Sequence, residues 1–313
     1  MVLYNLFMKN YPVHIIIPVY NSAEFLEKCI ESCLFQTYKN IDIFLIDDGS
    51  TDDSISILSK YESNPKIHII KQENKGPGAA RNAGILACNN NGYITFVDSD
   101  DWISPDYIEH FFNAEQVDFD LSFYSNKDFT CSKENILYSL LTWDSPRGPV
   151  RKLIKTDIVK RNLFDEKYYY GEDLLFNFGV FLNSNSFVML NINECGYNIS
   201  PNNRSLTRSK VTQKRLRDSY LTWYQSFLLC EKFEFLNSKI LKAKFINVLA
   251  NEFLEFYGSN KIKDNEYKTI KKYVNKNKII KKFKPENKIQ KRKKILYLYF
   301  RPLYKTIRKI VKA

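Results

Sequence analysis

The stretch Tyr93-Ile94-Thr95-Phe96-Val97-Asp98-Ser99-Asp100-Asp101 points to both the fold and a candidate site. Its first five residues form an apolar run typical of a buried strand. In an extended chain Asp98 and Asp100 point to the same side, and two carboxylates that close repel each other unless a cation neutralises them. Oxygen ligands suit Mg²⁺ or Mn²⁺, which usually bind a few carboxylates together with substrate phosphates. The D-x-D spacing also occurs in surface turns, but its place after a buried strand favours a metal site.

Short apolar runs and helical patterns alternate ahead of this stretch. The runs typical of strands span 13–19, 41–46, 67–70 and 93–97, and the helical patterns span 22–36, 50–61 and 78–88. Ser22 is placed to cap the first of these helices. Strand–helix–strand repetition predicts a mostly parallel sheet with helices on both faces. Ligands of such sheets bind beyond the carboxyl ends of the strands, so the polar residues there are the candidates.

The second part of the chain has a different character. Segment 102–210 combines short helical stretches with loops, and from about residue 211 apolar and aromatic side chains recur at helical spacing. We therefore expect an α/β catalytic domain over 1–210 and a helical extension over 211–313. The extension holds 27 Lys and Arg against 8 Asp and Glu, whereas residues 1–210 hold 20 against 27. An acidic first part and a basic extension indicate two tasks.

The cysteines, the chain start and the hydropathy favour a cytoplasmic protein. The six cysteines form no C-x-x-C pair, and Cys29 and Cys33 share the apolar face of a predicted helix, as small buried residues do. No run approaches the roughly 18 to 20 apolar residues of a membrane-spanning helix. The first residues lack the basic region of a signal peptide.

Two acidic residues follow the second predicted strand. Asp47 and Asp48 precede Gly49-Ser50-Thr51-Asp52. This composition is typical of a turn that caps the next helix. It also suits a carboxylate that accepts a hydrogen bond from a ligand at the end of a strand, and the sequence leaves both interpretations open.

A glycine-rich segment, Lys75-Gly76-Pro77-Gly78-Ala79-Ala80-Arg81-Asn82, lies between these two acidic sites. Glycines such as Gly78 allow close backbone approach, and the helix that follows presents free N–H groups to an anion. Arg81 falls in the first turn of that helix, where a cation opposes the helix dipole. Arg81 is therefore either a solvated side chain or a residue that faces a phosphate or base.

Four motifs occur in the chain in a set order. They are Ile15-Ile16-Ile17-Pro18-Val19-Tyr20-Asn21, Ile46-Asp47-Asp48-Gly49-Ser50-Thr51-Asp52, Asn74 to Asn82, and Phe96-Val97-Asp98-Ser99-Asp100-Asp101. Together they resemble glycosyltransferase family 2, whose members have the GT-A fold. The resemblance is dense over residues 12 to 112. It implies an inverting, metal-dependent transferase of the bacterial cell-surface glycan type, acting in lipopolysaccharide or capsule synthesis, with a hexosyl or N-acetylhexosaminyl donor.

The resemblance also implies roles for single residues. Asp47 would contact the uracil of a UDP-linked donor, Arg81 the base or diphosphate, Asp98 the ribose or donor, and Asp100 the Mn²⁺ or Mg²⁺ ion. The residues expected to bind the nucleotide sugar are Pro18, Tyr20, Asn21, Asp47, Asp48, Gly78, Arg81, Asp98, Ser99 and Arg208. Asp98 and Asp100 are the expected metal ligands. For Arg208, a solvated loop is the alternative.

The family's acceptor-activating carboxylate usually sits in a Glu-Asp pair, which Gly171-Glu172-Asp173 matches. Asp173 is the expected general base and Glu172 the alternative, because adjacent side chains on a helix diverge. The base would take a proton as the acceptor oxygen attacks the anomeric carbon. A helix start enriched in acidic residues is the purely structural interpretation.

The last segment, 261–313, interleaves Lys and Arg with apolar and aromatic residues. Such a helix suits an anionic membrane surface, and a lipid-linked or glycan acceptor would explain it. A solvated charged face and a nucleic-acid-binding arm are the alternatives, the second disfavoured by the acidic first part. We expect a peripheral enzyme at the inner face of the cytoplasmic membrane. The Q-x-x-R-W motif of processive synthases is absent, which favours single transfer; a noncatalytic sugar-nucleotide-binding protein is the competing function.

Overall fold

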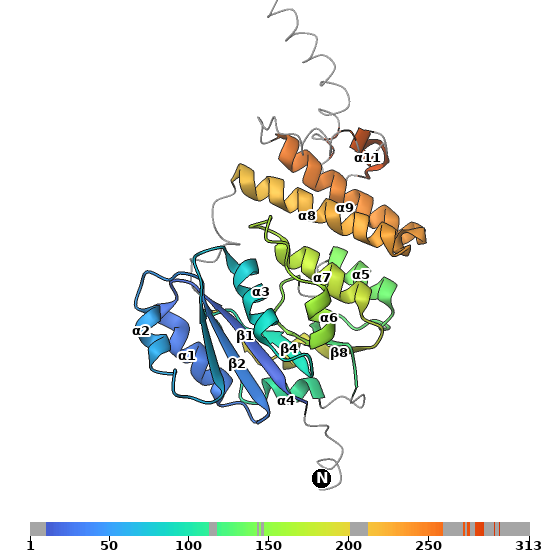
Figure 1. Cartoon of the computed structure of the whole chain (residues 1–313). Helices are drawn as coiled ribbons and strands as arrows, with labels where there is room; N and C mark the ends of the chain where they lie inside the picture. Colours follow the sequence, from blue (N-terminus) through green and yellow to red (C-terminus); the bar gives the residue numbers. More distant parts are fainter. Residues whose placement is uncertain are drawn as a thin grey trace, which may run out of the picture. The chain divides into compact units, whose positions relative to one another are not determined.

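Figure 1 shows strands flanked by helices in the first part of the chain and helices alone in the second. The computed structural model describes residues 11–112, 118–142, 144, 147–200, 212–258, 272, 274–275, 279–284, 291 and 294. The chain forms two compact units, residues 1–209 and 210–313. The functional assignment of the two predicted domains stays a prediction, and each unit is described by itself.

The first unit contains a seven-stranded sheet. Its strands are β1 Val13–Val19, β2 Ile41–Asp47, β3 Ile67–Lys71, β4 Tyr93–Phe96, β6 Leu121–Ser125, β7 Lys152–Lys155 and β8 Phe187–Asn191. They lie in the order β3-β2-β1-β4-β7-β6-β8. Strands β3, β2, β1 and β4 are parallel neighbours, β7 is antiparallel to both β4 and β6, and β8 is parallel to β6. The expected mostly parallel sheet is confirmed.

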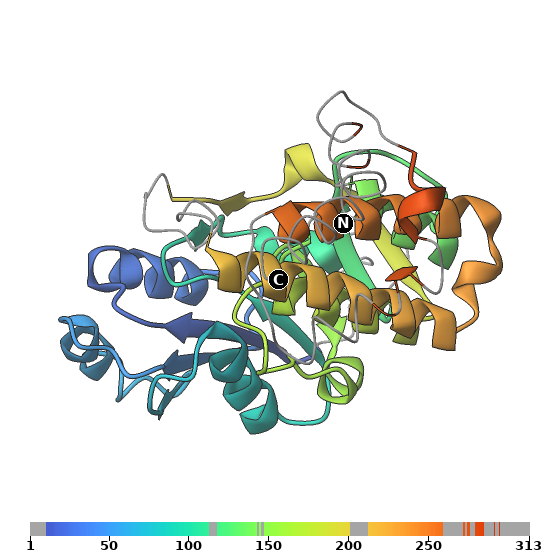
Figure 2. The same ribbon diagram turned by 90° about the horizontal axis from the view of Figure 1, so that it is seen from above.

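Helices cover both faces of this sheet. They are α1 Ala23–Leu34, α2 Ser54–Ser59, α3 Pro77–Ala87, α4 Tyr107–Phe112, α5 Lys133–Thr142, α6 Thr156–Arg161 and α7 Glu172–Asn183, with a 3₁₀ turn, η2, at Ile192–Glu194. Apolar residues of α1, α2 and α4 join alternate residues of β1 and β2 in one buried cluster. On the other face α3 approaches β1 closely, since a Cβ added at Gly84 would lie 2.6 Å from Cγ2 of Ile16. Figure 2 shows the blue α1 and the teal α3 on opposite sides of the strands.

A second, two-stranded sheet stands beside the large one. It pairs β5, Trp102–Ile103, with β9, Tyr197–Asn198, in antiparallel register. Because β5 directly follows the D-x-D stretch and β9 lies almost a hundred residues later, this pairing ties the end of the first unit to the loop after β4.

The structure corrects several expectations for this unit. The segment after Asp101 is not mainly loops and short helices, because it supplies β6, β7 and β8. Helix α2 covers only Ser54–Ser59 of the predicted span 50–61. Ser22 occupies the N-cap position of α1, but its side chain makes no capping hydrogen bond. Cys29 and Cys33 are buried and free, as predicted.

The second unit is helical where the structure describes it. It comprises α8 Gln213–Lys232, a 3₁₀ turn, η4, at Phe235–Asn237, α9 Lys239–Gly258 and α11 Ile279–Lys282. Edge-to-face ring contacts join α8 to α9, with Trp223 and Phe227 both against Phe245. Among the described residues no helix combines the length and the apolar character needed to cross a bilayer. Most of the basic segment 261–313 lies outside the described residues.

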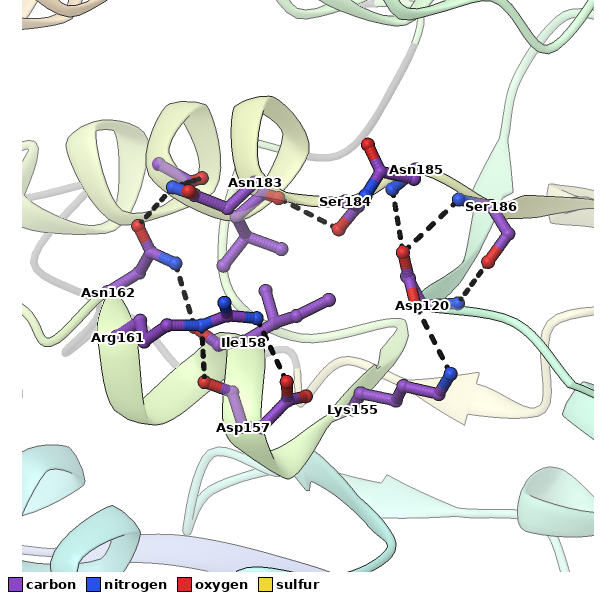
Figure 3. Close-up of polar contacts among 12 residues, drawn as sticks. Asp120, Lys155, Asp157, Ile158, Arg161, Asn162, Asn183, Ser184, Asn185 and Ser186 are labelled. Carbon is purple, nitrogen blue, oxygen red and sulfur yellow. Dashed lines mark hydrogen bonds and ion pairs between the residues drawn. The ribbon is translucent and has the colours of Figure 1, made fainter.

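One carboxylate joins three elements at the start of β6. Asp120 accepts hydrogen bonds from the backbone N–H groups of Asn185, at 2.7 Å, and Ser186, at 3.3 Å, ahead of β8. Its other oxygen lies 3.2 Å from Nζ of Lys155 at the end of β7. Figure 3 shows these contacts beside the Asp157–Arg161 pair on α6. Burial alone would raise the pKa of Asp120, but the N–H groups and Lys155 outweigh it and hold that pKa below its ordinary value.

Asp120→Ala is therefore expected to lower the free energy of unfolding by about 2 kcal/mol at pH 7, because two backbone N–H donors and Lys155 lose a charged acceptor. Asp157→Ala is the matched control. Its ion pair with Arg161 is about 60% exposed on both sides and should contribute less than about 1 kcal/mol. Urea unfolding of both variants measures the difference.

The pH dependence has a definite sign. Because folding lowers the pKa of Asp120, its stabilisation is present above the unfolded-state pKa and is lost as pH falls through the folded-state pKa. The difference in the free energy of unfolding between wild type and Asp120→Ala should therefore become smaller at acidic pH. If Asp120→Ala and Asp157→Ala lose the same free energy of unfolding at pH 7, the stabilising role of Asp120 is contradicted.

Candidate active site

The D-x-D stretch forms the loop between β4 and β5 at the carboxyl edge of the sheet. Asp101 is buried, and its carboxylate accepts the N–H of Ser200 at 2.8 Å. Burial raises the pKa of Asp101 to about 6. Asp101 therefore fastens the loop to the segment after β9. The side chain of Asp98 is 38% exposed, and Asp100 is half-buried.

Arg81 connects this loop to two helices. It lies in α3, and its guanidinium donates to Oδ1 of Asp98 at 2.9 Å and approaches Oε1 of Glu172, the first residue of α7, at 3.6 Å. The Arg81 side chain is only 8% exposed. Burial alone would lower the pKa of Arg81, but the carboxylates of Asp98 and Glu172 raise it, so the cation is retained. The helix-start arginine thus faces protein carboxylates, and its contact with a phosphate or base stays a prediction.

The glycine-rich segment makes room for this cluster. A Cβ added at Gly78 would lie 3.3 Å from Cγ of Glu172, and one added at Gly76 would lie 3.4 Å from the ring of Tyr169. The residue after Arg81 adds a clamp, since the Asn82 side chain exchanges hydrogen bonds with the backbone of Phe164 in both directions, each at 2.9 Å. The chain leading into α7 therefore lies directly against the start of α3.

The two acids at the start of α7 have different surroundings. Glu172 faces Arg81, whereas Oδ1 of Asp173 accepts the N–H of Leu174 at 2.7 Å. Burial raises the pKa of both carboxyls. For Asp173 the nearby cations of Arg81 and Lys152 oppose that rise. Two carboxyls that ionise above their ordinary range suit proton transfer near neutral pH.

Lys152 is a site residue that the sequence analysis missed. It is the first residue of β7, is fully buried, and donates through Nζ to the carbonyl of Gly148 at 2.6 Å. Burial lowers its pKa to about 7, and the charge of Asp173 works against that fall. A lysine in a short strand carries no sequence signal for such a position.

The loops after β1, β2 and β4 are tied together by short polar contacts. Asn21, at φ 49°, accepts the N–H of Thr51 at 2.8 Å through its side chain, and its own N–H donates to Oγ of Ser50 at 3.1 Å. The hydroxyls of Ser22 and Ser99 lie 2.6 Å apart. Three of the sequence motifs therefore meet at one edge.

Asp47 and Asp48 both hold turns in this structure. Asp47 accepts the N–H of Ser50 at 3.0 Å. Asp48 accepts the N–H groups of Lys75 at 2.9 Å and Gly76 at 2.8 Å, and so fixes the glycine-rich segment. Of the two interpretations left open, the turn is seen directly, and ligand contacts by Asp47 and Asp48 stay predictions. Pro18 is half-buried nearby, and Tyr20 is 49% exposed.

The described residues fit a metal ion that is shared with a substrate. No group of three or more His, Cys, Asp and Glu side chains among them is arranged to hold a metal by itself. Asp98 and Asp100 offer carboxylate oxygens on a partly exposed loop, and Mg²⁺ and Mn²⁺ are commonly completed by phosphate oxygens and water. These two carboxylates would suit a metal ion that also binds a diphosphate. Arg208 lies outside the described residues.

Known proteins share both the sequence motifs and the fold. The model of the family described as Glycosyl transferase family 2 matches residues 14–163. The glycosyltransferase GlyA of Streptococcus pneumoniae is 50% identical over 98 residues, which are 31% of this chain and 14% of that protein. The crystal structure of S. aureus TarS 1-349 in complex with UDP-GlcNAc has a TM-score of 0.60 at 21% identity, over 87% of this chain and 82% of that one. That likeness establishes the GT-A fold.

The extent of these matches differs. The chain spans well under two thirds of GlyA. It spans more of GlyG from the same S. pneumoniae strain, which is 30% identical over 210 residues, 56% of this chain and 69% of that protein. With the four ordered motifs and the GT-A sheet in place, the chain belongs to glycosyl transferase family 2.

Proposed function

We propose that this chain transfers one sugar from a nucleotide-diphosphate sugar to a hydroxyl group of a cell-surface glycan or lipid-linked acceptor, with inversion at the anomeric carbon. The observation that carries the proposal is the contact of Arg81 with both Asp98 and Glu172. It joins the D-x-D loop, the glycine-rich segment and the Glu-Asp pair in one cluster around a buried guanidinium. The transferred sugar is proposed to be a hexosyl or an N-acetylhexosaminyl group.

The donor half of the site lies over β1, β2 and β4. The nucleoside would contact Pro18, Tyr20 and Asn21 after β1 and Asp47 after β2, with UDP as the proposed nucleotide. Asp98 and Asp100 would hold Mn²⁺ or Mg²⁺, and such an ion draws off the charge that develops on a departing diphosphate. Support for a UDP-linked donor comes from the solved TarS complex, which contains UDP-GlcNAc.

Asp173 is the proposed general base. The carboxylate of Glu172 forms an ion pair with Arg81. Asp173 forms no ion pair with another described residue. As the acceptor oxygen forms its bond to the anomeric carbon, the bond from that carbon to the diphosphate breaks and the acceptor proton passes to Asp173. Glu172 remains the alternative base. A protein that binds nucleotide sugars without catalysis is the competing function.

The basic extension is proposed to hold the enzyme at the inner face of the cytoplasmic membrane. Residues 284–313 contain eleven Lys and Arg and a single acidic residue, Glu286. Each basic residue near an anionic surface contributes about 1 kcal/mol of attraction. An enzyme at that surface meets a lipid-linked acceptor in two dimensions, which raises the encounter rate.

Asp100→Ala and Asp173→Ala should fail in different ways. Hydrolysis of a panel of UDP-, GDP- and dTDP-sugars, with and without Mn²⁺, identifies the donor without any acceptor. Asp100→Ala is expected to weaken metal-dependent donor binding at least about tenfold, because a ligand is lost. Asp173→Ala is expected to lower turnover roughly 10²- to 10⁴-fold with donor affinity kept. Asp157→Ala, exposed on α6, is the control. Unchanged turnover in Asp173→Ala would remove Asp173 from the mechanism.

The pH profile of turnover should depend on Lys152. Transfer requires ionised Asp173, whose pKa is raised above 3.8 by burial, so kcat/KM should fall as pH drops through that raised value. Lys152 has a pKa of about 7, so it carries a positive charge below that pH. Lys152→Met removes that cation, raises the pKa of Asp173, and should move the limb to higher pH by roughly one unit.

Lys60→Met, a change at an exposed lysine, is the control for this shift. The melting temperature of each variant establishes that it is folded before profiles are compared. If the acidic limb of the kcat/KM profile does not move in folded Lys152→Met, a group other than Asp173 is responsible for that limb.

Membrane attachment is tested with liposomes. The full chain should float with vesicles rich in anionic lipid, and a chain truncated after Phe283 should not, since it lacks the eleven basic residues. Zwitterionic vesicles and high salt are the controls, because both remove the electrostatic attraction. Equal flotation of the two chains would contradict attachment through this segment.

A further inference from the structure

Arg151 has an unusual backbone conformation for its residue type. It directly precedes β7 and has φ 63°, one of three non-glycine residues with positive φ in the described part of the chain, with Asn21 and Glu234. Asparagine tolerates this region, but arginine gains nothing from it. The conformation is held by the sheet, because the carbonyl of Arg151 accepts the N–H of Tyr124 at 3.3 Å. Strained residues of this kind concentrate at functional sites.

The strand register places Arg151 beside the candidate active site. β7 is antiparallel to β4, with Ile94 opposite Ile154. Extending this register by three residues along each chain brings Arg151 level with Val97, the residue before Asp98. Strands β2, β1, β4 and β7 are neighbours in that order. The motifs proposed to contact the nucleoside follow β2 and β1, the D-x-D loop follows β4, and Arg151 precedes β7. Arg151 lies on the side of the D-x-D loop away from the nucleoside.

The guanidinium of Arg151 rests on an aromatic ring that is anchored to the D-x-D loop. Its Cζ lies 5.4 Å from the ring centroid of Tyr197. The hydroxyl of Tyr197 accepts the N–H of Asp98 at 3.1 Å. A ligand that contacts Arg151 is thus within reach of the residues that would hold the diphosphate.

Arg151 differs from Arg81 in its partners. Arg81 has carboxylates on two of its nitrogens. For Arg151 no ion pair is formed with any described carboxylate. Its Nε, like that of Arg81, is buried without a hydrogen-bond acceptor. A buried donor without an acceptor is unfavourable. The planar guanidinium fork matches the two oxygens of a carboxylate or phosphate.

We propose that Arg151 determines acceptor specificity by binding an anionic group, a carboxylate or a phosphate, on the acceptor. The proposal rests on the glycosyl transfer proposed above. The acceptor is favoured over the donor because Arg151 stands one strand beyond the D-x-D loop, on the side opposite the nucleoside. An acceptor carrying a uronic acid or a phosphodiester has the required chemistry.

Binding of small probes to the full chain saturated with UDP and Mg²⁺ tests this assignment. Methyl β-D-glucuronide and sn-glycerol 3-phosphate supply the anionic groups, and methyl β-D-glucoside is the neutral match. Ligand-observed NMR gives the dissociation constants for wild type, Arg151→Asn and Arg161→Asn. Asparagine accepts the left-handed backbone, so Arg151→Asn keeps the fold while it removes the cation. Arg161 is an exposed arginine on α6, and Arg161→Asn is the control because it removes the same charge at another position.

Wild type and Arg161→Asn are expected to bind the anionic probes about tenfold more tightly than the glucoside. Arg151→Asn should lose this preference, with an unchanged affinity for UDP and a melting temperature at or above that of wild type. No preference in wild type, or a preference that persists in Arg151→Asn, would overturn the proposal. A tenfold loss of UDP affinity in Arg151→Asn would also overturn it, because Arg151 would then belong to the donor site. Failure of wild type to bind UDP at all would instead reject the UDP-linked donor of the proposed transfer.

Discussion

The ion pairs of buried Arg81 are the interaction on which the candidate site depends. Asp98 and Glu172 come from a loop and a helix far apart in the sequence, and one guanidinium contacts both. Carboxylates taken out of water are costly unless a cation stands close to them. Arg81 and Lys152 face three acids, Asp98, Glu172 and Asp173, and burial weakens the charge of Lys152. The acids of this cluster outnumber its cations, and burial raises the pKa of Glu172 and Asp173.

The position of α7 relative to the D-x-D loop is set by packing as well as by charge. The rings of Phe164 and Phe176 are stacked, with centroids 4.1 Å apart, and the ring of Phe96 meets each of them edge-on. Phe96 is the last residue of β4, two residues before Asp98. Together with the clamp between Asn82 and Phe164, this apolar group places the start of α7. A hydrophobic contact thus determines which carboxylates meet Arg81.

The first hundred residues could be predicted well from the sequence because each signal there is local. Runs such as Val13–Val19 are long, apolar and rich in β-branched residues, and the D-x-D follows one of them directly. Strands β6 and β7 carry no such signal, since they are short and bury polar residues, among them Ser122 and Lys152. Their place comes from pairing with strands that are distant in sequence. For Arg151 the informative facts are a backbone angle and a missing partner, and neither can be read from residue types.

The two halves of the candidate site differ in the same way, because one is specified by local motifs and the other by contacts between distant segments. The donor half is built from strand ends and the turns after them, so a fixed set of short motifs is enough to form it. The other half is built from β7 and its neighbours, where Tyr124 holds the backbone of Arg151 and Tyr197 supports its side chain. The hydrogen bond from Tyr124 involves only the backbone of Arg151, so the sheet does not require an arginine side chain there. The residue proposed to select the acceptor therefore lies next to the donor half of the site without being part of a motif.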